Sequence, residues 1–122
     1  MDRERRVTMQ AGSCHCGKVK FEVEGEFSEA MECNCSHCSR KGYLLWFVPR
    51  EQLHLQTPQD DLSTYRFNRH VIDHQFCPNC GCAPFGLGSA PDGKATAAVN
   101  IRCLEGVDLT SVKRVPVDGR SY

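Results

Sequence analysis

The sequence predicts a mainly β protein. Short runs of β-branched and aromatic residues are separated by glycine, proline and asparagine, which is typical of short strands joined by turns. Helical signals are confined to a turn after Ser36 and to residues 108–113. At 122 residues the chain fits a single domain, residues 1–122, with a modest core.

Each expected strand follows from the pattern of its own residues. Val19, Phe21 and Val23 alternate with charged residues, as in a half-buried strand. The apolar run at residues 43–48, ended by Pro49, suits a strand buried on both faces. Further strands are expected at residues 53–55, 63–68, 71–76 and 95–103, with a hairpin turn at Asn68 and Arg69.

The composition argues against nucleic-acid and membrane binding. The 15 basic and 15 acidic residues give a formal net charge of zero, and the basic residues are scattered among acids rather than grouped in a stripe. No stretch approaches the roughly 18 apolar residues of a membrane span, and the charged residues 1–6 precede no apolar run of a signal peptide. We therefore expect a cytoplasmic protein with reduced thiols.

Eight of the nine cysteines fall into three clusters, at residues 14–16, 33–38 and 77–82. Cysteines one or two residues apart let one tight turn present two sulfurs to the same ion, and zinc takes four ligands in a tetrahedron. In a reducing compartment, clustered cysteines more often hold metal than form disulfides. Eight thiols are enough for two four-coordinate zinc ions, so two zinc ions are predicted.

The economical pairing of these clusters predicts one closed, structural zinc site. Cys14 and Cys16 lie in a turn just before the first clear strand, and Cys77 and Cys80 form a Cys-x-x-Cys knuckle just after a later one. Two such knuckles that face each other supply all four ligands and leave no open position.

The remaining cluster supplies three ligands to a second zinc, and these are Cys33, Cys35 and Cys38. Three protein ligands with one position for solvent or substrate are the pattern of a catalytic zinc. Cys82, two residues beyond Cys80, is a candidate fourth ligand that would close this second site. The sequence leaves both versions open.

The order of these motifs resembles the glutathione-dependent formaldehyde-activating enzyme family, which also includes centromere protein V. The resemblance rests on GSCHCGKV at residues 12–19, CNCSHC at 33–38, FCPNCG at 76–81 and VNIRCLEGVD at 99–108, and it covers nearly the whole chain. It implies a Mss4-like fold, with folded sheets of short antiparallel strands and zinc knuckles. It also implies a structural and a catalytic zinc on the cysteines named above, and the formation of S-hydroxymethylglutathione from formaldehyde and glutathione.

A three-thiolate zinc with an open position would bind a substrate thiol as thiolate or polarise a carbonyl. Both fit a carbon–sulfur lyase that acts on S-hydroxymethylglutathione or a related hemithioacetal, with a small thiol such as glutathione as partner. The candidate catalytic residues are Cys35, central in its loop, and His37, which could move a proton or hydrogen-bond a thiolate. A solvent-facing loop residue is the alternative for His37. Arg40 and Lys41 follow and could attract a substrate carboxylate or balance thiolate charge.

Two other functions are consistent with the same residues. A non-catalytic, zinc-stabilised binding module would have a fourth protein sulfur on the second zinc. A thiol-based redox or zinc sensor, suggested by the surplus cysteines, would lose zinc reversibly on mild oxidation. The sequence predicts neither the aldehyde, nor the thiol, nor the oligomeric state.

Overall fold

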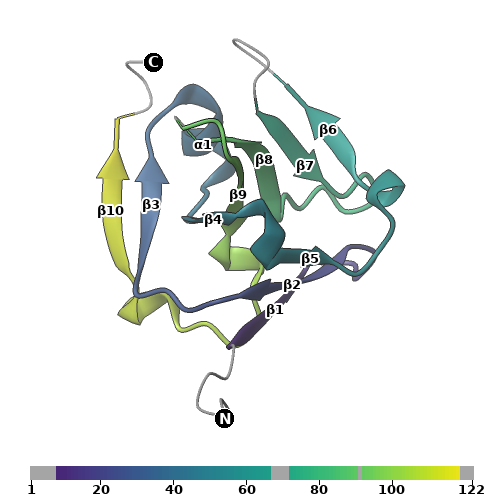
Figure 1. Cartoon of the computed structure of the whole chain (residues 1–122), viewed down its shortest axis with the longest axis horizontal. Helices are drawn as coiled ribbons and strands as arrows, with labels where there is room; N and C mark the ends of the chain where they lie inside the picture. The colour runs from purple at the N-terminus through teal and green to yellow at the C-terminus, as the bar shows by residue number, and fades with distance from the viewer. Residues whose placement is uncertain (1–7, 67–71, 91, 119–122) are drawn as a thin grey trace.

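Two β-sheets enclose the hydrophobic core in the computed structural model, which describes residues 8–66, 72–90 and 92–118 (Figure 1). The smaller sheet has three antiparallel strands in the order β1 (Met9–Ser13), β2 (Lys20–Glu24) and β5 (Leu53–Leu55). Its strands lie in the lower part of Figure 1. The prediction of a mainly β fold is confirmed.

The larger sheet has seven strands in the order β10-β3-β4-β9-β8-β7-β6, with β10 and β3 paired in parallel and the other neighbours antiparallel. These strands are β3 (Glu29–Cys33), β4 (Leu45–Pro49), β6 (Ser63–Tyr65), β7 (Asp73–Phe76), β8 (Phe85–Ser89), β9 (Ala95–Asn100) and β10 (Lys113–Val117). A short helix, α1 (Ser36–Lys41), follows β3. Single 3-10 turns lie at Arg50–Gln52, Gln59–Asp61, Ile101–Cys103 and Leu109–Ser111.

The core joins the two sheets through the predicted alternating strand. Val19, Phe21 and Val23 have no exposed surface. Phe21 packs edge-on against Phe85 of the larger sheet, with ring centroids 5.5 Å apart. The chain passes close to this ring at Gly12, where a Cβ would lie 2.4 Å from Phe21 Cζ. A side chain at Gly12 would have to displace this fully buried ring, and such overpacking of a core costs about 1–3 kcal/mol.

The prediction that residues 43–48 form a strand buried on both faces is wrong. β4 begins at Leu45, and Phe47 is 51% exposed whereas Val48 is 4% exposed. Successive residues of a strand point to opposite faces of the sheet. Phe47 therefore lies on the outer face of the larger sheet, away from the core, and an antiparallel sheet tolerates one solvated face.

The strand predicted at residues 53–55 is confirmed with the same bounds as β5, whereas other predicted elements differ from the structure in their bounds or type. The strand expected at 95–103 ends at Asn100, because the side-chain oxygen of that residue accepts the backbone N–H of Arg102 and caps a 3-10 turn. The segment 108–113 forms a 3-10 turn that leads into β10 rather than an α-helix. Residues 67–71, which include the predicted turn at Asn68 and Arg69, lie outside the described residues.

The helix α1 is held at both ends by its neighbours in sequence. Cys35 is the N-cap, because its Sγ accepts the backbone N–H of Cys38 at 3.2 Å. Gly42 ends the helix with a left-handed φ of 72° and donates its N–H to the Cys38 carbonyl. In the part of the chain that the structure describes, no helix has the length and apolar character needed to cross a membrane.

Candidate metal centres and the adjoining pocket

The structure brings together the four cysteines that were paired from the sequence, here called the four-cysteine cluster. The Sγ atoms of Cys14, Cys16, Cys77 and Cys80 all lie within 4.8 Å of one another. Cys14 follows β1 of the smaller sheet and Cys77 follows β7 of the larger sheet, so the cluster connects the two sheets.

The two halves of the four-cysteine cluster share two local features. A backbone N–H donates to the sulfur of the first cysteine in each half, at 3.3 Å to Cys14 and 3.5 Å to Cys77. A glycine follows the second cysteine of each half, Gly17 with φ 84° and Gly81 with φ 83°. Such positive φ values favour glycine. Burial raises the pKa of Cys77, although the backbone N–H groups of Cys80 and Asn79 act in the opposite direction.

The sulfur–sulfur distances fit a shared metal ion and exclude a disulfide. Cys14 Sγ and Cys16 Sγ are 3.7 Å apart, and so are Cys16 Sγ and Cys77 Sγ. A tetrahedral zinc with Zn–S bonds of about 2.3 Å separates its sulfurs by about 3.8 Å, whereas a disulfide brings them to about 2.05 Å. All nine cysteines are free thiols. The donor set of the four-cysteine cluster therefore fits zinc.

Cys33, Cys35 and Cys38 form the three-cysteine cluster, and their sulfurs also lie within 4.8 Å of one another. Cys33 ends β3, Cys35 caps α1 and Cys38 lies in the first turn of the helix. The Cys35 N–H donates to Cys33 Sγ at 3.5 Å. Among the described residues no further histidine, cysteine or carboxylate belongs to this group. The cluster thus offers a metal three ligands.

Hydrogen bonds within the three-cysteine cluster influence which thiol ionises. Burial is the largest influence on Cys35 and raises its pKa, but hydrogen bonds from Cys38, Cys33 and the backbone outweigh it and leave the pKa below its ordinary value. Burial raises the pKa of Cys38, and the neighbouring thiols raise it further. Cys35 is therefore more readily a thiolate than Cys38.

Cys82, the candidate fourth ligand, lies beside the four-cysteine cluster. The largest influence on its pKa is a hydrogen bond from the backbone N–H of His15, which lowers it, but burial and the nearby Cys80 and Cys14 outweigh this and raise it. The Cys82 carbonyl accepts the Cys77 N–H at 2.9 Å. Cys82 belongs to neither sulfur group within the described residues, and the structure does not bring it to the three-cysteine cluster.

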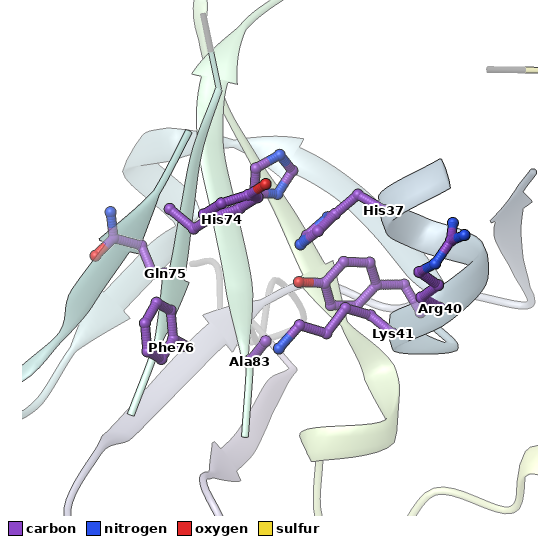
Figure 2. A pocket seen from close by; sticks show the side chains of 9 residues that line it. His37, Arg40, Lys41, His74, Gln75, Phe76 and Ala83 are labelled. Atoms are coloured by element: carbon purple, nitrogen blue, oxygen red, sulfur yellow. The ribbon is translucent and has the colours of Figure 1, made fainter. Parts of the chain in front are cut away.

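A pocket of about 460 Å³ adjoins the three-cysteine cluster (Figure 2). Tyr43, Phe76 and Ala83 line this pocket and also pack in the apolar group that surrounds Cys38. The volume is that of a small-molecule site. The remaining lining residues come from α1, β6 and β7, and they are His37, Arg40, Lys41, Tyr65, His74 and Gln75.

Two imidazole rings meet in the pocket. His37 of α1 and His74 of β7 face each other in Figure 2, with ring centroids 4.3 Å apart. Burial, followed by the nearby His37, lowers the pKa of His74 to about 4. Burial and then Lys41 lower the pKa of His37 as well. Tyr65 stacks on the His37 ring with centroids 5.4 Å apart. His37 therefore lies in the pocket wall, and both rings are neutral near pH 7.

The two basic side chains of α1 have different orientations. Lys41 extends into the pocket, with its Nζ 5.8 Å from the centre of the Phe76 ring (Figure 2). Arg40 turns back along the helix, and its Nη1 donates to the Ser36 carbonyl at 2.8 Å. Lys41 is thus the cation better placed to meet an anion bound in the pocket.

Sequence reasoning did not identify Tyr43, Tyr65 or His74 as pocket residues. The alternation of Ile72, His74 and Phe76 shows that these side chains share a face of their strand. This alternation alone favours a position for His74 at the edge of the core. It does not show whether the shared face points toward the smaller sheet or away from it. The position of His74 and Phe76 in the lining of the pocket supplies that information.

The fold and its sulfur groups define a β protein of the Mss4-like class whose cysteine clusters can hold metal. A family model described as "Glutathione-dependent formaldehyde-activating enzyme" matches residues 9–113, and the chain belongs to this family. A crystal structure of a Rhodobacter sphaeroides protein is similar to the chain, with 31% sequence identity and a TM-score of 0.73. The match covers 86% of this chain and 99% of that one. The family resemblance inferred from the motifs is confirmed.

Proposed function

We propose that the protein is a zinc-dependent carbon–sulfur lyase that acts on a hemithioacetal of a small thiol, such as S-hydroxymethylglutathione. The observation that carries this proposal is that three thiols, one ligand short of a closed tetrahedron, adjoin a pocket of about 460 Å³. Membership of the formaldehyde-activating family supports a glutathione-related substrate.

The two clusters take different parts in this proposal. The four-cysteine cluster would hold a structural zinc, and the three-cysteine cluster, with Cys35 at its centre, a second zinc. Bound there, the second ion would favour the thiolate form of the substrate sulfur. Cys82 is not a ligand in this proposal, because its side chain lies by Cys80 and Cys14.

In the direction of cleavage, the carbon–sulfur bond of the hemithioacetal breaks and its electron pair goes to sulfur. The hydroxyl oxygen loses its proton as the carbon–oxygen double bond forms, and the sulfur takes up a proton when the thiol is released. His37 lines the pocket next to Cys38, and its imidazole is the protein group that we propose holds the substrate hydroxyl and carries its proton. Formation of the adduct is the reverse.

Charge in the pocket supports an anionic thiol. Lys41 reaches into the pocket, and Arg40 lines its rim from the same helix. The carboxylates of a glutathione-like thiol would pair with these cations by charge-assisted hydrogen bonds. The cysteines must stay reduced for either cluster to bind metal, so we propose that the protein works in the cytoplasm.

The test is the exchange between free formaldehyde and S-hydroxymethylglutathione, followed by NMR with zinc-loaded protein. Wild type should accelerate the exchange, and Cys35→Ser should reduce the rate to that of an equal concentration of zinc in buffer. Cys82→Ser is the matched control, because it also removes one thiol, and it should keep the wild-type rate. The proposal fails if wild type accelerates the exchange no more than free zinc does.

The two alternatives predict different results in the same preparations. A binding module would show no acceleration and four protein sulfurs on every zinc. A thiol-based sensor would release zinc on mild oxidation and take it up again on reduction.

A further inference from the structure

An apolar trough of about 340 Å³ lies on the outer face of the larger sheet. Its floor is formed by Gly86 and Gly88 of β8 and by Ala98 of β9, and Phe47 and Ile72 also line it. Gly86 pairs with Ala98 across the sheet, so residues with little or no side chain lie next to each other there. The trough exists because the strands supply no bulky group at this point.

Two of the four large apolar side chains that are exposed in the described part of the chain line this trough. Phe47 is 51% exposed and Ile72 is 43% exposed, and both line it. Tyr65, 48% exposed, lines the neighbouring pocket. The other large apolar side chain this exposed in the described part of the chain is Met9, at 43%, in the smaller sheet. Exposed apolar groups that cluster in this way mark a binding surface.

The lining of the trough adjoins the lining of the pocket beside the three-cysteine cluster. His74 lines the pocket and pairs with Gly86 of the trough floor. A Cβ at Gly86 would lie 3.7 Å from His74 Nδ1 and 3.5 Å from Ile72 Cγ2. Ala98, at the other side of the floor, packs against the apolar group around Cys38. A ligand in the pocket can therefore extend over the glycines without leaving the protein surface.

We propose that the trough binds the apolar substituent of the substrate aldehyde, so that the preferred hemithioacetal carries a chain of several carbons or an aromatic ring. This inference rests on the proposed function and names the substrate class of the same site. The thiol end of the adduct lies by the cysteines and Lys41, and the carbon next to sulfur carries the apolar group toward Gly86. Formaldehyde has no such group and would leave the trough empty of substrate.

The first test compares S-methylglutathione with S-hexylglutathione, two stable thioethers that differ only in the apolar chain. Their affinities for zinc-loaded wild-type protein are measured by isothermal titration calorimetry. The hexyl compound should bind more tightly by on the order of 30-fold, because several methylene groups leave water.

Two variants locate the effect on the trough. Gly86→Ala adds a methyl group to the floor at ordinary contact distances, and Phe47→Ser removes an apolar residue of its lining. In each variant the affinities for the hexyl and methyl compounds should differ by no more than about threefold, because the trough is then partly filled or less apolar. Met9→Ser is the matched control, since it removes a similarly exposed side chain from the smaller sheet, and it should keep the full ratio.

The outcomes separate this inference from the proposed function. Equal binding of the two thioethers, or an unchanged ratio in both trough variants, overturns the inference and leaves the lyase proposal standing. Failure of both thioethers to bind overturns it too, and the formaldehyde exchange assay then decides the lyase proposal separately. If light scattering shows a dimer that Phe47→Ser converts to a monomer, the trough is an interface between two copies and the inference is wrong.

Discussion

The two cysteine clusters differ in how much of the chain they hold together. The four-cysteine cluster pairs Cys16 with Cys77, 61 residues away, and connects the two sheets. The three-cysteine cluster lies entirely within residues 33–38, where β3 meets α1. Two cysteines of the first cluster are buried, Cys14 and Cys77, and in the second only Cys38 is buried.

The comparison shows how the same ligand chemistry can serve the fold in one place and a binding site in another. Closing a long loop costs entropy in the unfolded chain, so a metal that bridges it stabilises the folded state. A structural zinc contributes about 10–16 kcal/mol in zinc-finger peptides, comparable with the whole stability of a domain, about 5–15 kcal/mol. A metal bound by the three-cysteine cluster, within residues 33–38, would close almost no loop. Its free coordination position could face a ligand.

The largest expected effect is that of Cys77→Ser, which breaks the four-cysteine cluster. The variant should be unfolded or molten even with zinc present, because the turn after β1 loses its link to β7 and the core between the sheets opens. Circular dichroism and thermal denaturation of zinc-loaded protein measure this. A folded variant with the full wild-type zinc content would show that the cluster does not hold the sheets together.

The next effect concerns Asn100, which connects the surroundings of the two clusters. Asn100 is 7% exposed, its Nδ2 donates to the Ala83 carbonyl at 3.1 Å, and its Oδ1 accepts the Leu44 N–H at 3.5 Å. Asn100→Ala removes both hydrogen bonds, leaves the Ala83 carbonyl with only the weak thiol donor of Cys103, and should lower the free energy of unfolding by about 2–4 kcal/mol. Urea denaturation of the two proteins measures this change in the free energy of unfolding.

Thr96→Ala, on the same strand as Asn100, is the control for this measurement. The Thr96 hydroxyl donates to the Lys94 carbonyl at an exposed position, so its loss should cost less than about 0.5 kcal/mol. If Asn100→Ala and Thr96→Ala lower the free energy of unfolding by the same amount, Asn100 does not connect the surroundings of the two clusters.

A smaller effect on stability is expected for Cys35→Ser, in the three-cysteine cluster. Serine is itself a good N-cap, so α1 should keep its start and the free energy of unfolding should stay within about 1 kcal/mol of wild type. Zinc content should fall by one equivalent per chain, as measured by atomic emission. Global unfolding of this variant would mean that the local cluster is structural too, and the contrast between the clusters would disappear.

The smallest effect is expected for Cys82→Ala. Because Cys82 lies outside both sulfur groups, zinc content should not change and stability should fall by less than about 1 kcal/mol. X-ray absorption counts the sulfurs at Zn–S distances of about 2.3 Å. A drop from four sulfurs to three at one site in this variant would make Cys82 the closing ligand and favour the binding module over the lyase.

The cysteine spacing predicted which sulfurs lie together within each cluster, and the economical pairing of clusters agrees with the groups in the structure. Neighbouring cysteines such as Cys14 and Cys16 are held near each other by the covalent chain, so only the choice of partner cluster remained open. The strand of Val19, Phe21 and Val23 was predictable for the same reason, since strand periodicity is a local property. Strands with weaker patterns, β1, β3, β8 and β10, were not predicted.

The pocket and the trough could not be read from the sequence in this way. Tyr65, His74 and Gly86 lie side by side because β6, β7 and β8 pair in one register. A shift of one residue in any of these strands would move the side chains to the other face of the sheet. Register depends on contacts between distant segments, and no local pattern reports them.

Ligand type, ligand spacing and family membership therefore follow from short stretches of sequence, because covalent geometry and local periodicity set them. Long-range strand pairing determines that Phe47 is exposed, that His74 meets His37, and that a glycine floor adjoins the pocket. The physical reason is that a side chain's surroundings depend on which face of the sheet is buried. That choice is made by the packing of the whole core.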